Sequence, residues 1–168
     1  MIYILGGVSG TGKSTIGARL ADELSLPFYD GDDFHPSANI EKMRLGIPLE
    51  DTDRQPWLET LARLIPQWSE QGGAVLACSA LKESYRQTLS SHYEDYIYWV
   101  MLTGTQELLA NRLDARQGHF FDPKLLRSQL DTLELPNYGR ILDVTPSPDK
   151  IIESLISPVE YEPPHPNI

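Results

Sequence analysis

The chain has 168 residues, a length that fits one domain with a single core and leaves no room for a second. Its net charge is −10, and its 14 basic residues form no run, so a nucleic-acid-binding surface is not expected. The only cysteine is Cys78, and the apolar stretch at the N-terminus is too short for a signal peptide or a membrane span. A protein of a reduced, cytoplasmic setting with no membrane partner is therefore expected.

The first element is an apolar run at residues 2–5, which leads into a glycine-rich segment and then into a helical stretch at 15–24. The segment has the spacing G-x-x-x-x-G-K-[ST], and the order strand, loop, helix indicates a phosphate-binding P-loop. Its backbone N–H groups and the positive end of the following helix would converge on polyphosphate. The residues predicted to bind ATP here are Gly7, Val8, Ser9, Gly10, Thr11, Gly12, Lys13, Ser14 and Thr15.

Two side chains of this loop have specific expected roles. Lys13 is a predicted catalytic residue, because its ammonium group would reach the β- and γ-phosphates. Ser14 would hold Mg²⁺ through its hydroxyl group. The alternative interpretation is a glycine-rich surface turn with an exposed lysine. It does not account for the strand before the loop and the helix after it.

The second apolar run, at residues 26–29, ends in a cluster of acids. In a doubly wound sheet, ligands bind beyond the carboxyl ends of the strands, so these acids should lie on the P-loop side. Asp30 is expected to orient a water molecule on Mg²⁺, and Asp32 is expected to accept a proton from an attacking hydroxyl group. A solvated acidic turn is the alternative.

Helical patterns follow at 37–45 and 56–71, and Pro66 predicts a kink or break in the second. Arg54 lies in a charged segment between them that we interpret as a loop, and its planar guanidinium would match a carboxylate. The third apolar run, at 74–78, leads to Lys82, a second candidate partner for an anionic substrate. Arg54 and Lys82 also have the alternative of being solvated surface cations.

A fourth apolar run at 96–102 precedes a helix that Thr105 should cap and that should end near residue 115. Arg112, Arg116 and His119 accompany a glycine-containing loop, interpreted as a mobile lid at about 116–124. A lid arginine can neutralise the phosphoryl group in transfer, which makes Arg116 a predicted catalytic residue. An exposed basic helix end and an ordinary loop histidine are the alternatives.

A last apolar run at 141–144 precedes a helix that starts at Ser147-Pro148 and ends near residue 156. Strands alternating with helices indicate an α/β fold, in which a parallel sheet is flanked by helices in three layers. The predicted kinase domain covers residues 1–157. Residues 158–168 are proline-rich and are interpreted as an extended or disordered tail.

Taken together, these segments resemble one family, the P-loop gluconokinases, which are relatives of the shikimate and adenylate kinases. The resemblance covers about residues 2–157. It rests on residues 7–14, Asp30-Gly31-Asp32 with His35-Pro36, Asn39-Ile40-Glu41-Lys42-Met43, Asp53-Arg54-x-Pro56-Trp57-Leu58, Cys78-Ser79-Ala80-Leu81-Lys82-x-x-Tyr85-Arg86, and Arg112-Leu113-x-x-Arg116-x-Gly118-His119-Phe120.

The resemblance implies phosphorylation of the 6-hydroxyl group of D-gluconate, dependent on ATP and Mg²⁺, by a cytoplasmic enzyme that is often a homodimer. It implies that Asp32 binds the sugar acid near the reacting hydroxyl group. The other substrate contacts that it implies are His35, Asn39, Arg54, Lys82 and His119, and Arg112 joins the ATP site. The sequence departs from the family pattern in its proline-rich end and in Thr11, where serine is commoner.

Three other functions are weighed against this one. A kinase of another small hydroxy acid, such as shikimate, would have the same fold, because substrate choice depends on a few pocket side chains. A GTP-dependent switch would explain Asn111-Arg112-Leu113-Asp114 only loosely, and no Asp-x-x-Gly motif is present. A nucleotide-binding scaffold without catalysis would need a damaged P-loop or lid. The sequence leaves open whether Arg54 or Lys82 meets the substrate carboxylate.

Overall fold

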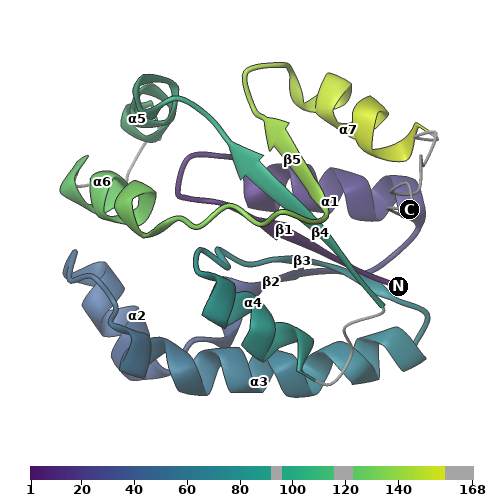
Figure 1. Ribbon diagram of the computed structural model, residues 1–168, viewed down its shortest axis with the longest axis horizontal. Coiled ribbons are helices and arrows are strands. Elements are labelled where there is room, and N and C mark those ends of the chain that lie inside the picture. The colour runs from purple at the N-terminus through teal and green to yellow at the C-terminus, as the bar shows by residue number, and fades with distance from the viewer. Residues whose placement is uncertain (92–95, 116–122, 158–168) are drawn as a thin grey trace, which may run out of the picture.

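Five parallel strands form one sheet in the order β2-β3-β1-β4-β5 (Figure 1). The computed structural model describes residues 1–91, 96–115 and 123–157. The strands are β1 (Ile2–Gly6), β2 (Phe28–Asp30), β3 (Ala74–Ala77), β4 (Ile97–Thr103) and β5 (Arg140–Asp143). The first strand of the chain is thus the middle of the sheet, and the α/β fold is confirmed.

Helices cover both faces of this sheet, so that its central strands are apolar on both sides. Figure 1 shows α3 and α4 along one side and α7 on the other. A short 3₁₀ turn, η1 (Gly31–Phe34), follows β2. The helices are α1 (Lys13–Leu24), α2 (Ser37–Arg44), α3 (Asp51–Glu70), α4 (Glu83–Ser90), α5 (Gln106–Asp114), α6 (Pro123–Thr132) and α7 (Pro148–Ile156).

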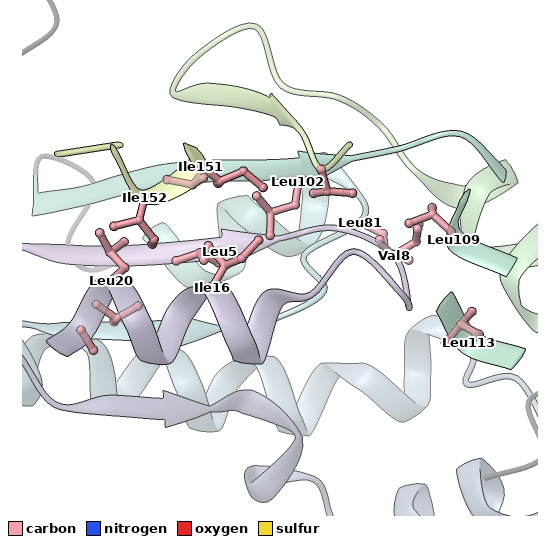
Figure 2. Close-up of a cluster of buried hydrophobic side chains, with 14 of the residues drawn as sticks. Leu5, Val8, Ile16, Leu20, Leu81, Leu102, Leu109, Leu113, Ile151 and Ile152 are labelled. Atoms are coloured by element: carbon pink, nitrogen blue, oxygen red, sulfur yellow. The ribbon is translucent and has the colours of Figure 1, made fainter. Parts of the chain in front are cut away.

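The core consists of two clusters, one on each face. In β1, Ile2 and Ile4 pack toward α3 and α4, whereas Leu5 packs toward α1 and α7, as the alternation of a strand requires. Figure 2 shows the second cluster, where Ile151 and Ile152 of α7 lie close to Leu5 of β1 and to the side chains of α1. Burying each such side chain contributes about 1.5–3 kcal/mol.

One prediction about α3 is wrong, and the break that Pro66 could cause is not found. The charged segment that includes Arg54 is not a loop but the first turn of α3, where the Asp53 carboxylate accepts from the Glu50 N–H at 2.9 Å. The helix continues through Pro66 to Glu70 without a break. Its buried face of tryptophan, leucine and isoleucine side chains outweighs the cost of two interior prolines, Pro56 and Pro66, about 3 kcal/mol each.

Other boundaries agree with the sequence to within a few residues. Thr105 caps α5 by accepting from Leu108 N at 3.2 Å, and Pro148 opens α7 as predicted. The helices α4 and α6 were not predicted. Within the described part of the chain, no helix is long and apolar enough to cross a membrane. The tail at 158–168 and most of the predicted lid lie outside the described residues.

Candidate active site

A pocket of about 730 Å³ opens at the carboxyl end of the sheet, where the loops after β1, β2 and β3 meet α3, α4 and α6. It brings together six residues that the sequence singled out, Ser9, Lys13, Asp32, His35, Arg54 and Lys82. Its other lining residues are Asp51, Trp57, Ser79, Leu81, Tyr85, Leu125, Ser128, Gln129, Thr132 and the segment 43–49.

The P-loop forms the floor of this region. Gly7, Gly10 and Gly12 all have positive φ angles, 134°, 85° and 87°. At Gly7 a Cβ atom would lie 2.5 Å from the Leu102 carbonyl oxygen, so only glycine fits there. Gly12 directly precedes α1, whose first backbone N–H groups have no partner within the helix and point toward an anion site.

The side chains of Ser14, in the first turn of α1, and Asp30, at the end of β2, lie side by side. The Ser14 hydroxyl donates to Asp30 Oδ2 at 2.6 Å, and Asp30 Oδ1 accepts from Asp32 N at 3.1 Å, which caps η1. A hydroxyl and a carboxylate oxygen are ligand types that suit Mg²⁺. No group of three or more His, Cys, Asp or Glu side chains able to hold a metal occurs in the described residues. An ion here would therefore take its remaining ligands from phosphate and water.

Asp32 faces the open pocket from η1, with 76% of its side chain exposed. Desolvation by the surrounding walls comes first, and the charge of Asp30 second, in raising the pKa of its carboxyl, while Lys13 opposes the shift. Asp33, the next residue, does not line the pocket. Asp32 and Asp33 are successive residues of the 3₁₀ turn η1, so their side chains point in different directions. We expected both acids at a strand end instead.

His35 is held rigidly beside Asp32. Its ring stacks on Trp57 with centroids 4.1 Å apart, and Trp57 Nε1 in turn donates to the Gly31 carbonyl at 2.7 Å. Burial first, and the positive charge of Arg54 second, lower the pKa of His35 to about 4. The ring is therefore neutral near pH 7.

Asn39 decides which ring nitrogen of His35 carries the proton. Asn39 Nδ2 donates to the Asp53 carbonyl at 2.7 Å, which fixes the orientation of the amide. The same nitrogen lies 3.2 Å from His35 Nδ1, so Nδ1 accepts and the proton is on Nε2. Nε2 faces Asp32 Oδ1 at 3.8 Å. Asn39 itself does not line the pocket, and its predicted contact with the substrate stays a prediction.

The two predicted carboxylate partners have different environments. Lys82 Nζ donates to both carboxylate oxygens of Asp51, at 2.8 and 2.9 Å, and this pairing leads in raising the pKa of Lys82 and lowering that of Asp51. Tyr85 OH also donates to Asp51. Arg54 instead donates to the Leu49 carbonyl, a neutral group, and lies 5.6 Å from the centroid of the Tyr85 ring. Both cations thus lie over one aromatic ring. Among the described residues, Lys82 forms an ion pair with a carboxylate, whereas Arg54 helps to lower the pKa of Asp51 and Asp53 without an ion pair to either.

Of the three residues predicted to act with the lid, the structure describes Arg112. Arg112 lies on α5 and donates to the Val144 carbonyl at 2.6 Å, between β5 and α7, and it does not line the pocket. Arg116 and His119 lie outside the described residues, so their roles stay predictions.

Sequence reasoning gave no role to several residues of the pocket, among them Asp51, Trp57, Tyr85 and Gln129. Gln129 lies on α6, and its Oε1 accepts from Ser9 N of the P-loop at 2.7 Å. The leucines at 125, 126, 130 and 133 recur at helical spacing, and this signal would have located α6. The contact of Gln129 with Ser9 has no sequence signal, because 120 residues separate the two.

Known proteins are similar to this chain in sequence and in structure. The sequence model of the shikimate kinase family matches residues 9–155. A probable gluconokinase from Dictyostelium discoideum is 41% identical over 94% of this chain and 85% of that protein. The gluconokinase of Gluconobacter oxydans is 44% identical over 93% of this chain and 89% of that protein.

Solved structures give the same picture. A gluconokinase from Sinorhizobium meliloti aligns with a TM-score of 0.82 at 39% identity, over 90% of this chain and 86% of that one. An APS kinase from Mycobacterium tuberculosis aligns over 92% and 94% with a TM-score of 0.66, but at 16% identity this likeness shows the fold alone.

Proposed function

Because this chain belongs to the shikimate kinase family and, at closer range, to the gluconokinases, we propose that it transfers the γ-phosphoryl group of ATP to the 6-hydroxyl group of D-gluconate. The products are ADP and 6-phospho-D-gluconate. The observation that carries the proposal is one pocket in which the P-loop lysine, a carboxylate and an arginine that forms no ion pair within the described residues face the same space. These are the groups that a phosphoryl donor, a reacting hydroxyl and a substrate carboxylate require.

The nucleotide end of the pocket fits a triphosphate. The three positive-φ glycines and the start of α1 form a cradle of N–H donors, and Lys13 borders the pocket beside Ser9. Ser14 and Asp30 would hold Mg²⁺, with Asp30 acting directly or through water. When bound, the ion neutralises charge on the β- and γ-phosphates.

Asp32 orients the attacking hydroxyl group and receives its proton. Its raised pKa makes it a better proton acceptor than an ordinary aspartate. His35 presents a neutral Nε2–H to the same space, where it donates to the reacting oxygen or to Asp32 without adding charge. In a loose transition state the proton leaves late, so orientation is the larger part of the Asp32 contribution.

The substrate carboxylate binds to Arg54. Lys82 is already neutralised by Asp51, and a second anion would compete with that pair. Arg54 spends one N–H on a neutral carbonyl and keeps its net charge for the substrate. The Tyr85 ring lies under both the Arg54 guanidinium and the Lys82 ammonium group.

An assay that couples ADP release to a spectroscopic signal, run over a panel of acceptors, tests the proposed function. D-Gluconate should be phosphorylated far faster than shikimate, glucose or nucleoside monophosphates, since a neutral sugar would leave the Arg54 charge unpaired. Equal activity on glucose and gluconate would contradict the proposal. A preference for shikimate would place the chain with the alternative hydroxy-acid kinases. The homodimer and the cytoplasmic setting stay predictions.

A further inference from the structure

One face of α6 forms a wall of the pocket. Leu125, Ser128, Gln129 and Thr132 follow each other at helical spacing and all line it. The Thr132 hydroxyl donates to the Ser128 carbonyl at 2.7 Å, so it serves the helix backbone. Gln129 is the residue of this face that reaches across to the P-loop, where its Oε1 lies 2.7 Å from Ser9 N.

This contact fixes the orientation of the Gln129 carboxamide. A backbone N–H only donates, so the atom that meets Ser9 must be the carbonyl oxygen of the side chain. The Nε2 group then lies on the other side of the amide with two N–H donors. Among the described residues, no partner of Nε2 is found.

Gln129 also lies where the two substrates would meet. Of the P-loop residues between Gly7 and Ser14, only Ser9 and Lys13 line the pocket that holds Asp32. A side chain anchored on Ser9 therefore lies at the junction between phosphoryl donor and acceptor.

We propose that Gln129 is a specificity-determining residue whose Nε2 donates to a hydroxyl group of the acceptor's polyol chain. The inference rests on the proposed function. Arg54 is assigned to the carboxylate, and Asp32 with His35 to the reacting hydroxyl group, which leaves the intervening hydroxyls to be recognised. A neutral, rigidly oriented carboxamide suits a neutral hydroxyl group of the substrate. A charged side chain at this position would be left without an ionic partner, because the hydroxyl group carries no charge.

Two substitutions separate this role from simple anchoring of α6. Gln129→Met removes the acceptor and the donors at nearly the same length. Gln129→Glu keeps an acceptor for Ser9 N but removes the donors. Gln67→Met is the matched control, because Gln67 is exposed on α3 and donates only to the Arg63 carbonyl of its own helix. Steady-state kinetics with D-gluconate and ATP are measured for each, together with melting temperature.

Both Gln129 variants should raise KM for gluconate by about 3- to 10-fold, the value of one neutral hydrogen bond, while KM for ATP in Gln129→Met changes less than about 2-fold. Gln67→Met should match the wild type. In a series of gluconate analogues that each lack one hydroxyl between C2 and C5, one analogue should have the same KM with the wild type and with Gln129→Met. That analogue identifies the hydroxyl that Nε2 binds.

The inference is overturned if Gln129→Glu keeps the wild-type KM for gluconate, because Gln129 would then be an anchor alone. It is also overturned if the penalty of Gln129→Met persists with every analogue. If Gln129→Met fails to fold, the Gln129→Glu result decides by itself. A wild-type protein that does not phosphorylate gluconate overturns the proposed function, and this inference with it. A wild-type protein that does so, with unchanged variants, overturns the inference alone.

Discussion

Asp32 and Asp33 are neighbours on one 3₁₀ turn, yet only Asp32 faces the pocket. Asp32→Asn keeps the size of the side chain but removes its charge and turns one acceptor into a donor. We expect kcat with gluconate to fall by about 10² to 10⁴, the usual contribution of a positioned acid or base, while ATP still binds. Asp33→Asn is the control and should change kcat little. An essential Asp33 beside a dispensable Asp32 would remove Asp32 from the mechanism.

His35 should make the stability of the protein depend on pH in a defined window. The pKa of the ring is about 4 in the folded protein and about 6.5 when unfolded, so the unfolded chain binds the proton first as the pH falls. The stability due to the neutral ring is present in full above pH 6.5 and is lost as the pH falls toward 4. The loss should reach about 3 kcal/mol, from a shift of about 2.5 pH units.

Denaturant titrations at pH 7, 5.5 and 4 measure this loss, with His35→Gln as the reference that lacks the titrating ring. The free-energy difference between the two proteins should shrink or change sign as the pH falls. A constant difference across the three pH values would mean that His35 titrates normally and that the stacking on Trp57 does not keep it neutral.

Arg54 and Lys82 should respond differently to neutralisation. Arg54→Met should raise KM for gluconate by about 10- to 100-fold, since a hydrogen bond to a charged group contributes about 1.5–3 kcal/mol. Lys82→Met combined with Asp51→Asn, which leaves no unpaired carboxylate, should raise it by less than about 3-fold. KM for ATP should stay nearly constant in both. The reverse ranking in steady-state kinetics would assign the carboxylate to Lys82.

At the scale of elements, Pro66 interrupts the hydrogen-bond pattern of α3 without ending the helix. The Ala62 carbonyl there lacks its usual partner, and the helix persists through packing against the sheet. Pro66→Ala should restore the missing N–H and raise the free energy of unfolding by about 1–3 kcal/mol. Thermal denaturation checks this, with Pro146→Ala in the loop before α7 as the control. A lower melting temperature would show that proline's restriction of the unfolded chain dominates.

The sequence predicts strands better than the charged elements around the pocket. The apolar runs locate all five strands because a parallel sheet buries both faces, and the cap residue Thr105 locates α5. The sequence did not predict the start of α3, because Asp51 and Arg54 suggest a solvated loop when their partners are unknown. Lys82, the partner of Asp51, becomes visible only when the loop after β3 is placed beside α3, and Leu49, the partner of Arg54, only when the turn before α3 is formed. The motifs thus identify the residues of the pocket, but pairing between distant segments decides which charges are neutralised.

At the scale of the whole molecule, the pocket lies at one end of the sheet, and much of the core lies on the face covered by α1 and α7 (Figure 2). Ile152 is 6% exposed in this core and does not line the pocket. Ile152→Ala should cost about 2–4 kcal/mol of stability by leaving a cavity. Per folded molecule at 25 °C, kcat and KM for both substrates should be unchanged. A change in KM would mean that this core and the pocket are mechanically coupled.

The central place of β1 in the sheet has a consequence for how the protein is made. Ribosomes synthesise β1 first, but its two neighbours are β3 and β4, and the second of these ends only at Thr103. Until then this largely buried strand has at least one open edge, the kind of edge that pairs wrongly with other chains. The phosphate loop acquires its working shape only after these strands have been made, because Gly7 lies against Leu102 and its N–H donates to the Ser79 carbonyl. Such a topology, dominated by pairings distant in sequence, favours slow folding and dependence on chaperones.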